Sequence, residues 1–367
     1  MSQVGPARLI FVAEYYDDMA EMMREYSLQY FLADQTVSMY DIRNRREFLK
    51  RMEVPTIREE HLYLGSQVVV HSRKLKLTGY GDAFTAAQLE KKSATTLAMV
   101  KPDAFASAAE ICAAAADAGL VISQMRTVQL SQAQAQAFYA EHRAQPFYAQ
   151  LVSFMASGKI LAMELMGEDA VPKWRGLMES LRPRFGSDAT RNAVHGSDSA
   201  ASAEREAAFF FGGGNNFDVC TPCQSCSLAL ILPSAIKGGQ AANIMAAIAA
   251  DRGGAVNAVQ MFTLTKPNAE EFYEVYKGVV ADYTKKVSEL ASGPCIAVEF
   301  VSGNGAVETL REICGPSDPD VARTIRPASI RAKFGVNAVQ NAVHVTDLPE
   351  DGCLEVEYFF NLLASSA

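Results

Sequence analysis

The chain has 367 residues, 49% of them hydrophobic, so it is long enough for two or three domains with buried cores. Its 34 lysines and arginines and 42 aspartates and glutamates give a formal net charge of −8, which excludes a general attraction to nucleic acid or to an anionic membrane. The longest nearly continuous apolar run, 228–236, is broken by Pro233 and is far shorter than the ~20 residues that cross a bilayer. We expect a soluble protein. The N-terminus does not resemble a signal peptide, and the number of cysteines, seven, is odd. Together these features indicate a reducing, intracellular compartment with free thiols.

Residues 1–92 predict a small domain made mostly of β-strands. Short β-rich runs alternate with polar turns and cover residues 8–15, 29–32, 36–40, 62–64, 68–71 and 75–78. A basic cluster follows the third run and contains Arg43, Arg45, Arg46, Lys50 and Arg51. Such a cluster is either a docking surface for an acidic partner or an ordinary solvated face.

Residues 93–213 predict alternating strands and helices. The expected strands cover 96–100, 121–130 and 160–165, and the expected helices cover 108–118 and a segment capped by Ser131. This is the βαββαβ order of a ferredoxin-like α+β sandwich.

The same pattern occurs a second time in the chain. Asn-Ala-Val-His at 192–195 recurs at 341–344, an offset of 149 residues, whereas Ser-Gly at 157–158 recurs at 292–293, an offset of 135. The difference between these offsets makes the first copy 14 residues shorter between Leu165 and Arg182. We predict two homologous modules, 93–213 and 226–367, joined by a linker over 214–225.

Three cysteines lie at this linker. Cys220, Cys223 and Cys226 form two overlapping Cys-x-x-Cys spacings, which often begin a four-ligand zinc site. No second pair or histidine follows at a suitable spacing, so free thiols are favoured over a metal site and no metal ligand is assigned.

The repeated histidines are candidates for chemistry. His195 is followed by Ser197 and Glu206, whose hydroxyl and carboxylate could fix the imidazole tautomer and keep one ring nitrogen nucleophilic. The alternative is a structural histidine that was copied with its module.

Neighbouring residues favour phosphate handling. Lys101 directly follows a predicted strand, Arg182 could grip phosphate with two hydrogen bonds, and Asn192 could meet a sugar hydroxyl. Phe147 is either a stacking face for a base or a core residue. A Walker loop is excluded, because no Gly-rich segment precedes Lys-Ser or Lys-Thr.

Longer motifs resemble a known family. Asn-Ala-Val-His-Gly-Ser-Asp-Ser at 192–199, with Lys-Pro-Asp-Ala at 101–104 upstream and Ser-Ala-Glu at 202–204 downstream, resembles the nucleoside diphosphate kinase signature, and both modules are similar to that family. Residues 11–17 and 78–82 resemble the DM-ten domain, a pleckstrin-homology-like β fold of ciliary proteins. The resemblance implies an all-β pleckstrin-homology-like domain followed by two ferredoxin-like kinase modules.

The resemblance also implies a two-step transfer. His195 would take the γ-phosphoryl group from a nucleoside triphosphate bound with Mg²⁺ and pass it to a second nucleoside diphosphate. Tyr139 would lie beside this histidine, and Ser197 and Glu206 would support its orientation. The implied nucleotide-binding residues are Lys101, Phe147, Arg175, Arg182 and Asn192.

Both modules depart from the family pattern. In the first, the 14-residue deficit falls in a loop that carries a phosphate-contacting threonine in the family, and Gln145 replaces a common arginine. The second has a complete loop over 315–327, but its lysine position is Leu232 and its serine position is Thr346, so we predict a weak or inactive kinase module. Its other site residues are present: Arg311, Arg331, Asn341, His344 and Glu355.

The resemblance therefore implies a microtubule-associated phosphotransferase of the ciliary or flagellar axoneme, centrosome or basal body, within the cytoplasm. Its partners would be nucleoside tri- and diphosphates and tubulin or other axonemal proteins, with no nucleic acid and no membrane. The alternative is a catalytically inert structural protein of the inner doublet that uses its three domains as interaction surfaces. We expect the two modules to pair within one chain.

Overall fold

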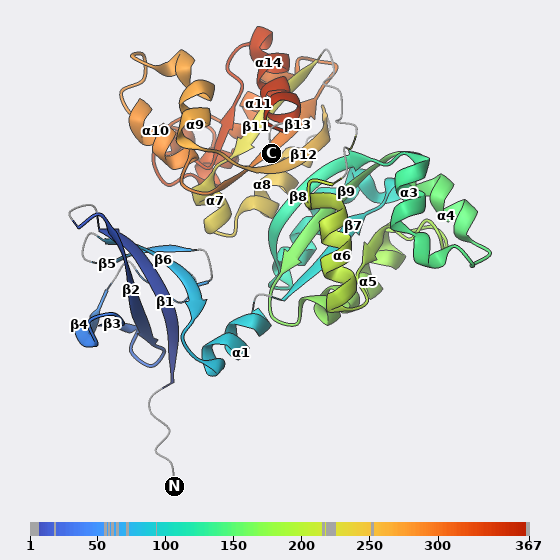
Figure 1. The fold of residues 1–367 in the computed structure, drawn as a ribbon. Coiled ribbons are helices and arrows are strands. Elements are labelled where there is room, and N and C mark those ends of the chain that lie inside the picture. Colours follow the sequence, from blue (N-terminus) through green and yellow to red (C-terminus); the bar gives the residue numbers. More distant parts are fainter. Residues whose placement is uncertain are drawn as a thin grey trace. The chain divides into compact units, whose positions relative to one another are not determined.

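The protein is represented by a computed structural model that describes residues 7–17, 20–54, 57, 59, 62–63, 66–70, 73–92, 94–214, 217, 225–250 and 253–364. It divides into two compact units, Met1–Ser93 and Ala94–Ala367 (Figure 1). Among the described residues, no helix is long and apolar enough to cross a membrane.

The N-terminal unit is an antiparallel sheet with the strand order β4-β3-β2-β1-β6-β5. Its elements are β1 (Arg8–Asp17), β2 (Met22–Phe31), β3 (Thr36–Asp41), β4 (Arg46–Glu53), β5 (Gln67–Val70), β6 (Arg73–Tyr80) and a helix, α1 (Ala83–Lys92). Alternating β1 residues Leu9, Phe11 and Ala13 are buried in its core. Thr85 of α1 accepts a hydrogen bond from the Ile10 amide at 2.7 Å, which ties the helix to the sheet.

The predicted β domain is confirmed, although three details differ. Leu62 and Tyr63 lie outside any strand, so the strand expected at 62–64 was wrong. Strand β4 and helix α1 were not predicted. Nearly all of β4 is exposed or half-exposed at the edge of the sheet, so it lacks the alternation of apolar and polar residues that marks a strand in a sequence.

The second unit contains one continuous sheet with the strand order β10-β7-β9-β8-β12-β13-β11-β14. The first module supplies β7 (Thr95–Val100), β8 (Val121–Gln129), β9 (Lys159–Met166) and β10 (Val194–Gly196). The second supplies β11 (Cys226–Ile231), β12 (Ala255–Thr263), β13 (Pro294–Val301) and β14 (Val343–Val345). Strands β11 to β14 correspond to β7 to β10, and they follow each other across the sheet in the opposite order. The two halves meet where β8 and β12 pair at Arg126 and Gln260. This confirms the predicted ferredoxin-like α+β fold.

Helices cover the sheet in each module. The first has α2 (Ala108–Asp117), α3 (Gln132–Phe138), α4 (Tyr148–Met155), α5 (Ala170–Phe185) and α6 (Ala200–Phe211). The second has α7 (Pro233–Lys237), α8 (Ala241–Ala249), α9 (Lys266–Phe272), α10 (Tyr283–Leu290), α11 (Ala306–Cys314), α12 (Pro319–Ile325), α13 (Ile330–Phe334) and α14 (Gly352–Glu357). The 14-residue deficit is visible here, because the single helix α5 stands where the second module has α11, α12 and α13.

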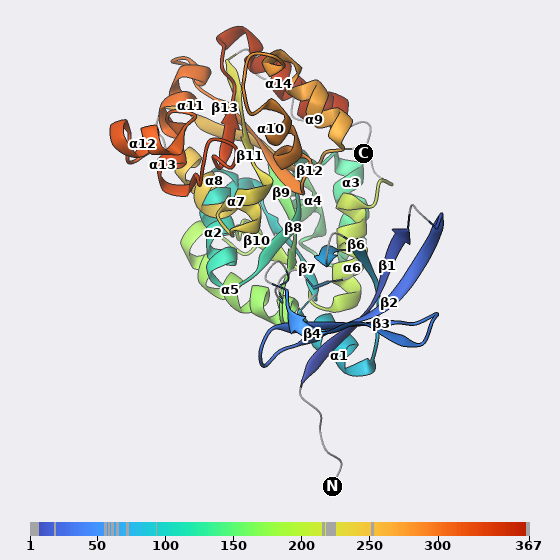
Figure 2. The same ribbon diagram turned by 90° about the vertical axis from the view of Figure 1, so that its left-hand side faces the viewer.

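The two modules share a core. One apolar cluster includes buried residues of both modules, among them Ile111 of α2 and Ile248 of α8, and Figure 2 shows these two helices side by side. Polar contacts join the sheet halves: the Val259 amide donates to Thr127 Oγ1 at 2.9 Å, and Lys159 Nζ donates to Asn257. The modules therefore pair within one chain.

Candidate active site

His195 lies at one edge of the sheet, on β10, where it pairs with Met99 of β7. Two residues before it, Ala193 has a φ of 65°, a left-handed conformation that is strained for a residue with a side chain. Two hydrogen bonds hold it there: its carbonyl accepts from the Lys101 amide at 2.8 Å, and its amide donates to Asp103 at 3.1 Å. Ala342 before His344 has a φ of 73°, so both modules have the same turn before the histidine.

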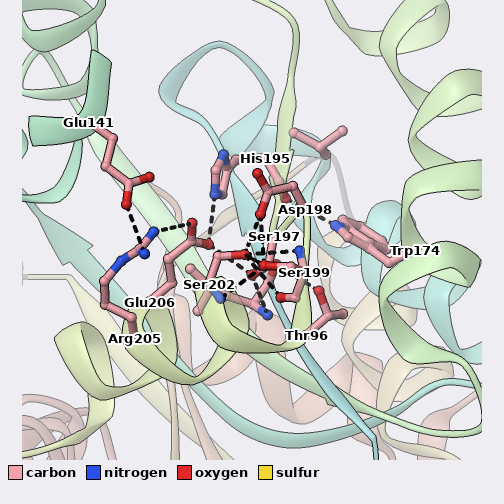
Figure 3. A network of polar contacts seen from close by, with 12 residues as sticks. Thr96, Glu141, Trp174, His195, Ser197, Asp198, Ser199, Ser202, Arg205 and Glu206 are labelled. Carbon is pink, nitrogen blue, oxygen red and sulfur yellow. Dashed lines mark hydrogen bonds and ion pairs between the residues drawn. The ribbon is translucent and has the colours of Figure 1, made fainter. Parts of the chain in front are cut away.

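The imidazole of His195 is held through one ring nitrogen (Figure 3). Its Nε2 lies 2.9 Å from Glu206 Oε2, and Ser197 Oγ donates to the same oxygen at 2.8 Å. A carboxylate only accepts, so Nε2 carries the proton and Nδ1 keeps its lone pair. Among the described residues, Nδ1 has no hydrogen-bond partner. The arrangement leaves a nucleophilic nitrogen directed away from the supporting carboxylate.

Tyr139 lies beside this ring, as the resemblance implied. The ring centroids of Tyr139 and His195 are 6.1 Å apart in an edge-to-face arrangement. The ring centroid of Phe138 lies 5.5 Å from that of the imidazole. The Tyr139 hydroxyl is buried and has no hydrogen-bond partner among the described residues. Burial raises the pKa of Tyr139, so this hydroxyl stays protonated at neutral pH and can act as a donor.

Two cationic side chains and an amide meet near the turn that precedes β10. Lys101, only 6% exposed at the end of β7, donates through Nζ to Asn192 Oδ1 at 2.6 Å and to the Thr190 carbonyl at 3.3 Å. Burial lowers the pKa of Lys101 to about 8, the Asp103 carboxylate opposes this shift, and the positive charge of Arg182 adds to it. Arg182 is exposed on α5 and its guanidinium donates to the Val194 carbonyl at 3.4 Å. The structure therefore brings together Lys101, Arg182 and Asn192.

Phe147 and Arg175 lie on other elements. Phe147 precedes α4, is 46% exposed and has its ring 6.0 Å from that of His142. It is not a core residue, which leaves the face of its ring accessible for stacking. Arg175 is on α5. Hydrogen bonds from Ser202 and Ser199 lower the pKa of Asp198, three residues after His195, and the positive charge of Arg175 adds to this shift.

Trp174 also supports this site, and the sequence analysis did not identify it. Its side chain is fully buried, and its Nε1 donates to the carbonyl of His195 at 3.0 Å. A Cβ at Gly196 would overlap the indole ring, so glycine directly after the histidine gives the ring its space. The repeat contains a signal for this pair, because Gly196 is replaced by Val345, and the residue in the place of Trp174 is the smaller Leu310.

The second module repeats the histidine geometry. His344 Nε2 lies 3.1 Å from Glu355 Oε2, and Thr346 Oγ1 donates to that oxygen at 2.9 Å. Thr346 thus performs the contact that Ser197 makes in the first module. Leu232 occupies the backbone position of Lys101, because its amide donates to the Ala342 carbonyl at 3.0 Å.

A cavity of about 670 Å³ opens beside His344. Its lining includes Leu232, Arg311, Arg331, Asn341 and His344. Arg331 donates to the carbonyls of Val343 and Gly315, Asn341 donates to the Ser317 carbonyl at 3.0 Å, and Arg311 forms an ion pair with Asp347. The predicted residues Arg311, Arg331, Asn341 and His344 therefore line one cavity. The remaining predicted residue, Glu355, holds the imidazole of His344.

The linker cysteines contribute no assigned site. Cys220 and Cys223 lie outside the described residues, while Cys226 begins β11 with its Sγ 3.6 Å from that of Cys353. In the part of the chain that the structure describes, no three His, Cys, Asp or Glu side chains gather to hold a metal ion.

Comparison with known proteins identifies the two modules. A family model described as nucleoside diphosphate kinase matches residues 94–215 and 225–364. The chain belongs to the nucleoside diphosphate kinase family. It is 44% identical over 375 residues to nucleoside diphosphate kinase homolog 7 of Rattus norvegicus, covering 97% of this chain and 93% of the rat protein, and the Mus musculus homolog 7 gives the same values. The nucleoside diphosphate kinase of Desulfovibrio desulfuricans is 43% identical over 131 residues, which cover 32% of this chain and 94% of the bacterial protein.

Proposed function

We propose that the first module transfers the γ-phosphoryl group of a nucleoside triphosphate to a nucleoside diphosphate through a phosphohistidine at His195. The hydrogen bond from His195 Nε2 to Glu206 carries this proposal, because it leaves Nδ1 unprotonated and without a hydrogen-bond partner among the described residues. The family membership of the module supports the same reaction.

In the first step, the Nδ1 lone pair attacks the γ-phosphorus, the bond from this phosphorus to the β–γ bridging oxygen breaks, and the nucleoside diphosphate leaves with the bond electrons. In the second step, a terminal phosphate oxygen of another nucleoside diphosphate attacks the phosphohistidine, and Nδ1 recovers its lone pair. Glu206 stabilises the positive charge that the phosphorylated ring carries, and it keeps the proton on Nε2 throughout.

The remaining site residues position the nucleotide in this proposal. Lys101 and Arg182 neutralise phosphate charge together with Arg175, Asn192 meets the ribose, and Phe147 stacks on the base. Mg²⁺ would enter this site with the nucleotide, as the family membership supports, and would neutralise phosphate charge.

A coupled transfer measurement tests the proposal. Purified protein is mixed with one nucleoside triphosphate and a diphosphate of a different base, and formation of the second triphosphate is followed. We expect transfer by the wild type and its loss in His195→Ala, whereas His344→Ala should retain most of it. Absence of transfer by the wild-type protein would overturn the enzymatic proposal.

We further propose that the protein works in the cytoplasm on ciliary or flagellar axonemes or at basal bodies and centrosomes, with tubulin or axonemal proteins as partners. The N-terminal resemblance to DM-ten domains supports this placement. Co-sedimentation of the full chain with microtubules tests it, and a chain that stays in the supernatant at every tubulin concentration would count against it.

A second candidate function is an inert structural protein of the inner doublet. The single helix α5 favours it, because the first module lacks an element that corresponds to α12 beside the cavity of the second. Normal microtubule attachment of a His195→Ala variant, combined with no transfer by the wild type, would favour this function.

A further inference from the structure

The second module has a lysine that its repeat does not predict. Lys286 is on α10, three residues after Tyr283, and the matching position on α4 is Leu151, three residues after Tyr148. The match is secure, because the two tyrosine hydroxyls make equivalent hydrogen bonds, to the Glu270 carbonyl at 3.3 Å and to the Gln136 carbonyl at 3.2 Å. Leu151 is buried in the first module, whereas Lys286 lines the cavity beside His344.

Lys286 and Lys101 direct their ammonium groups to the same loop of their respective modules. Lys286 Nζ donates to the Ala338 carbonyl at 2.8 Å, and Lys101 Nζ donates to the Thr190 carbonyl at 3.3 Å. At the 149-residue offset, Ala338 corresponds to Ala189, the neighbour of Thr190. The two lysines start from different elements and reach successive carbonyls of the same loop.

The charge of the cavity depends on this lysine. Four cationic side chains and three carboxylates line the cavity, so without Lys286 these charges would balance. Arg311 and Arg326 form ion pairs with Asp347 and Glu312. Lys286 has no carboxylate within ion-pair distance among the described residues, and only one of its three N–H donors is used, by Ala338. Burial and the nearby charge of Arg331 lower the pKa of Lys286, as expected for a cation held inside such a cavity.

We propose that Lys286 replaces the missing lysine at position 232 and makes the second module a binding site for the phosphates of a nucleoside diphosphate or triphosphate. This inference rests on the proposed function in treating the cavity beside His344 as a nucleotide site. The sequence predicts a weak or inactive second module because leucine stands at position 232 in place of a lysine. Lys286 supplies a positive charge to the cavity in spite of this replacement. Binding is thereby retained in a module whose transfer activity we expect to be weak.

Calorimetric titration of the full chain with ADP and Mg²⁺ tests the proposal. Lys101→Met weakens the first site, so about one ADP per chain should remain bound, at the second module. Adding Lys286→Leu should weaken this remaining site roughly tenfold or more, as expected for loss of a hydrogen bond to a charged group. Lys286→Arg keeps the charge and should bind more tightly than the leucine variant. Leucine is the residue that the first module has at this position, and the thermal unfolding midpoint checks that the variant is folded.

Lys285→Met is the matched control, because Lys285 is exposed next to Lys286, pairs with Asp282 at 2.9 Å and does not line the cavity. It should leave the remaining site unchanged. A remaining site that is insensitive to Lys286→Leu, an arginine variant no better than the leucine variant, or no remaining site in Lys101→Met would each overturn the proposal. Because binding is measured and not transfer, an inactive His195 would leave these outcomes unaffected.

Discussion

The position of one proton decides what His195 can do. Glu206 fixes the proton on Nε2, and an amide in its place would offer N–H groups that compete for this nitrogen. We predict that Glu206→Gln lowers the rate of His195 phosphorylation by at least about tenfold, because the ring would favour the tautomer protonated on Nδ1. Single-turnover labelling measures this rate. Ser197→Ala removes one contact to the carboxylate and should have the smaller effect; an equal or larger effect would contradict this role of Glu206.

Lys101 should make nucleotide binding dependent on pH. Its pKa of about 8 in the folded protein means that the side chain is charged below this pH and becomes neutral above it. We expect ADP affinity of the first module to fall roughly tenfold between about pH 7 and about pH 9, following the loss of the protonated fraction. Titration calorimetry measures the change, and Lys101→Met should abolish it. A pH-independent wild type would show that Lys101 does not contact the phosphates.

The same residue affects stability with a defined sign. The folded pKa lies below the ordinary lysine value of 10.5, so between about pH 8 and this value the unfolded chain binds more protons than the folded chain. The contribution of Lys101 to the free energy of unfolding therefore increases as the pH rises through this window.

Individual residues were predictable from the sequence only where a motif or the repeat marked them. His195, Asn192 and Lys101 follow from the repeated tetrapeptide and from a cation at a strand end, and the structure brings them close to the same turn. Trp174 was missed although the repeat changes it together with Gly196, since a tryptophan among the apolar residues of a helix normally indicates core packing. Lys286 was also missed, because a lysine near the start of a helix resembles any solvated residue until the loop it reaches is known.

At the scale of elements, the two modules pack the helix after their third strand against the histidine strand with different pairs of residues. Trp174 packs on Gly196 in the first module, and the corresponding residues of the second, Leu310 and Val345, are both buried in the shared apolar cluster. We predict that Gly196→Val destabilises the protein by about 1 to 3 kcal/mol, the usual cost of overpacking, because valine would overlap the indole. Denaturant unfolding measures this change.

The double variant Gly196→Val with Trp174→Leu provides the control for that prediction. It recreates the pair of the second module. Its loss of unfolding free energy should therefore be smaller than the sum of the losses in the two single variants. Additive free energies of unfolding would show that the two positions do not compensate each other.

The offsets of the repeat predicted the deficit between Leu165 and Arg182, and the structure shows its form. Helix α5 runs without interruption to Phe185, whereas the second module reaches the same point through α11, α12 and α13. One consequence could not be predicted: Arg182 at the end of the long helix is exposed, but its counterpart Arg331 is buried and donates to two backbone carbonyls. Only the packing of α11 to α13 around the arginine distinguishes the two.

At the scale of the whole molecule, the internal repeat produces one sheet from two modules. The strands β8 and β12 pair with each other, and the shared apolar cluster joins α2 with α8. Because the two modules already pair with each other within one chain, we predict a monomer in solution. Analytical ultracentrifugation should give the mass of one chain, and a hexamer would contradict the prediction.

The most direct test of the proposed chemistry is labelling of the full chain with γ-phosphate-labelled ATP and Mg²⁺, comparing the wild type with His195→Ala and His344→Ala. We expect label that is stable in base and lost in acid, as for a phosphohistidine, and we expect it to disappear in His195→Ala alone. This result would place the intermediate on the first module despite its shortened loop. Label that persists in His195→Ala, or no label in any of the three proteins, would contradict a phosphohistidine at His195.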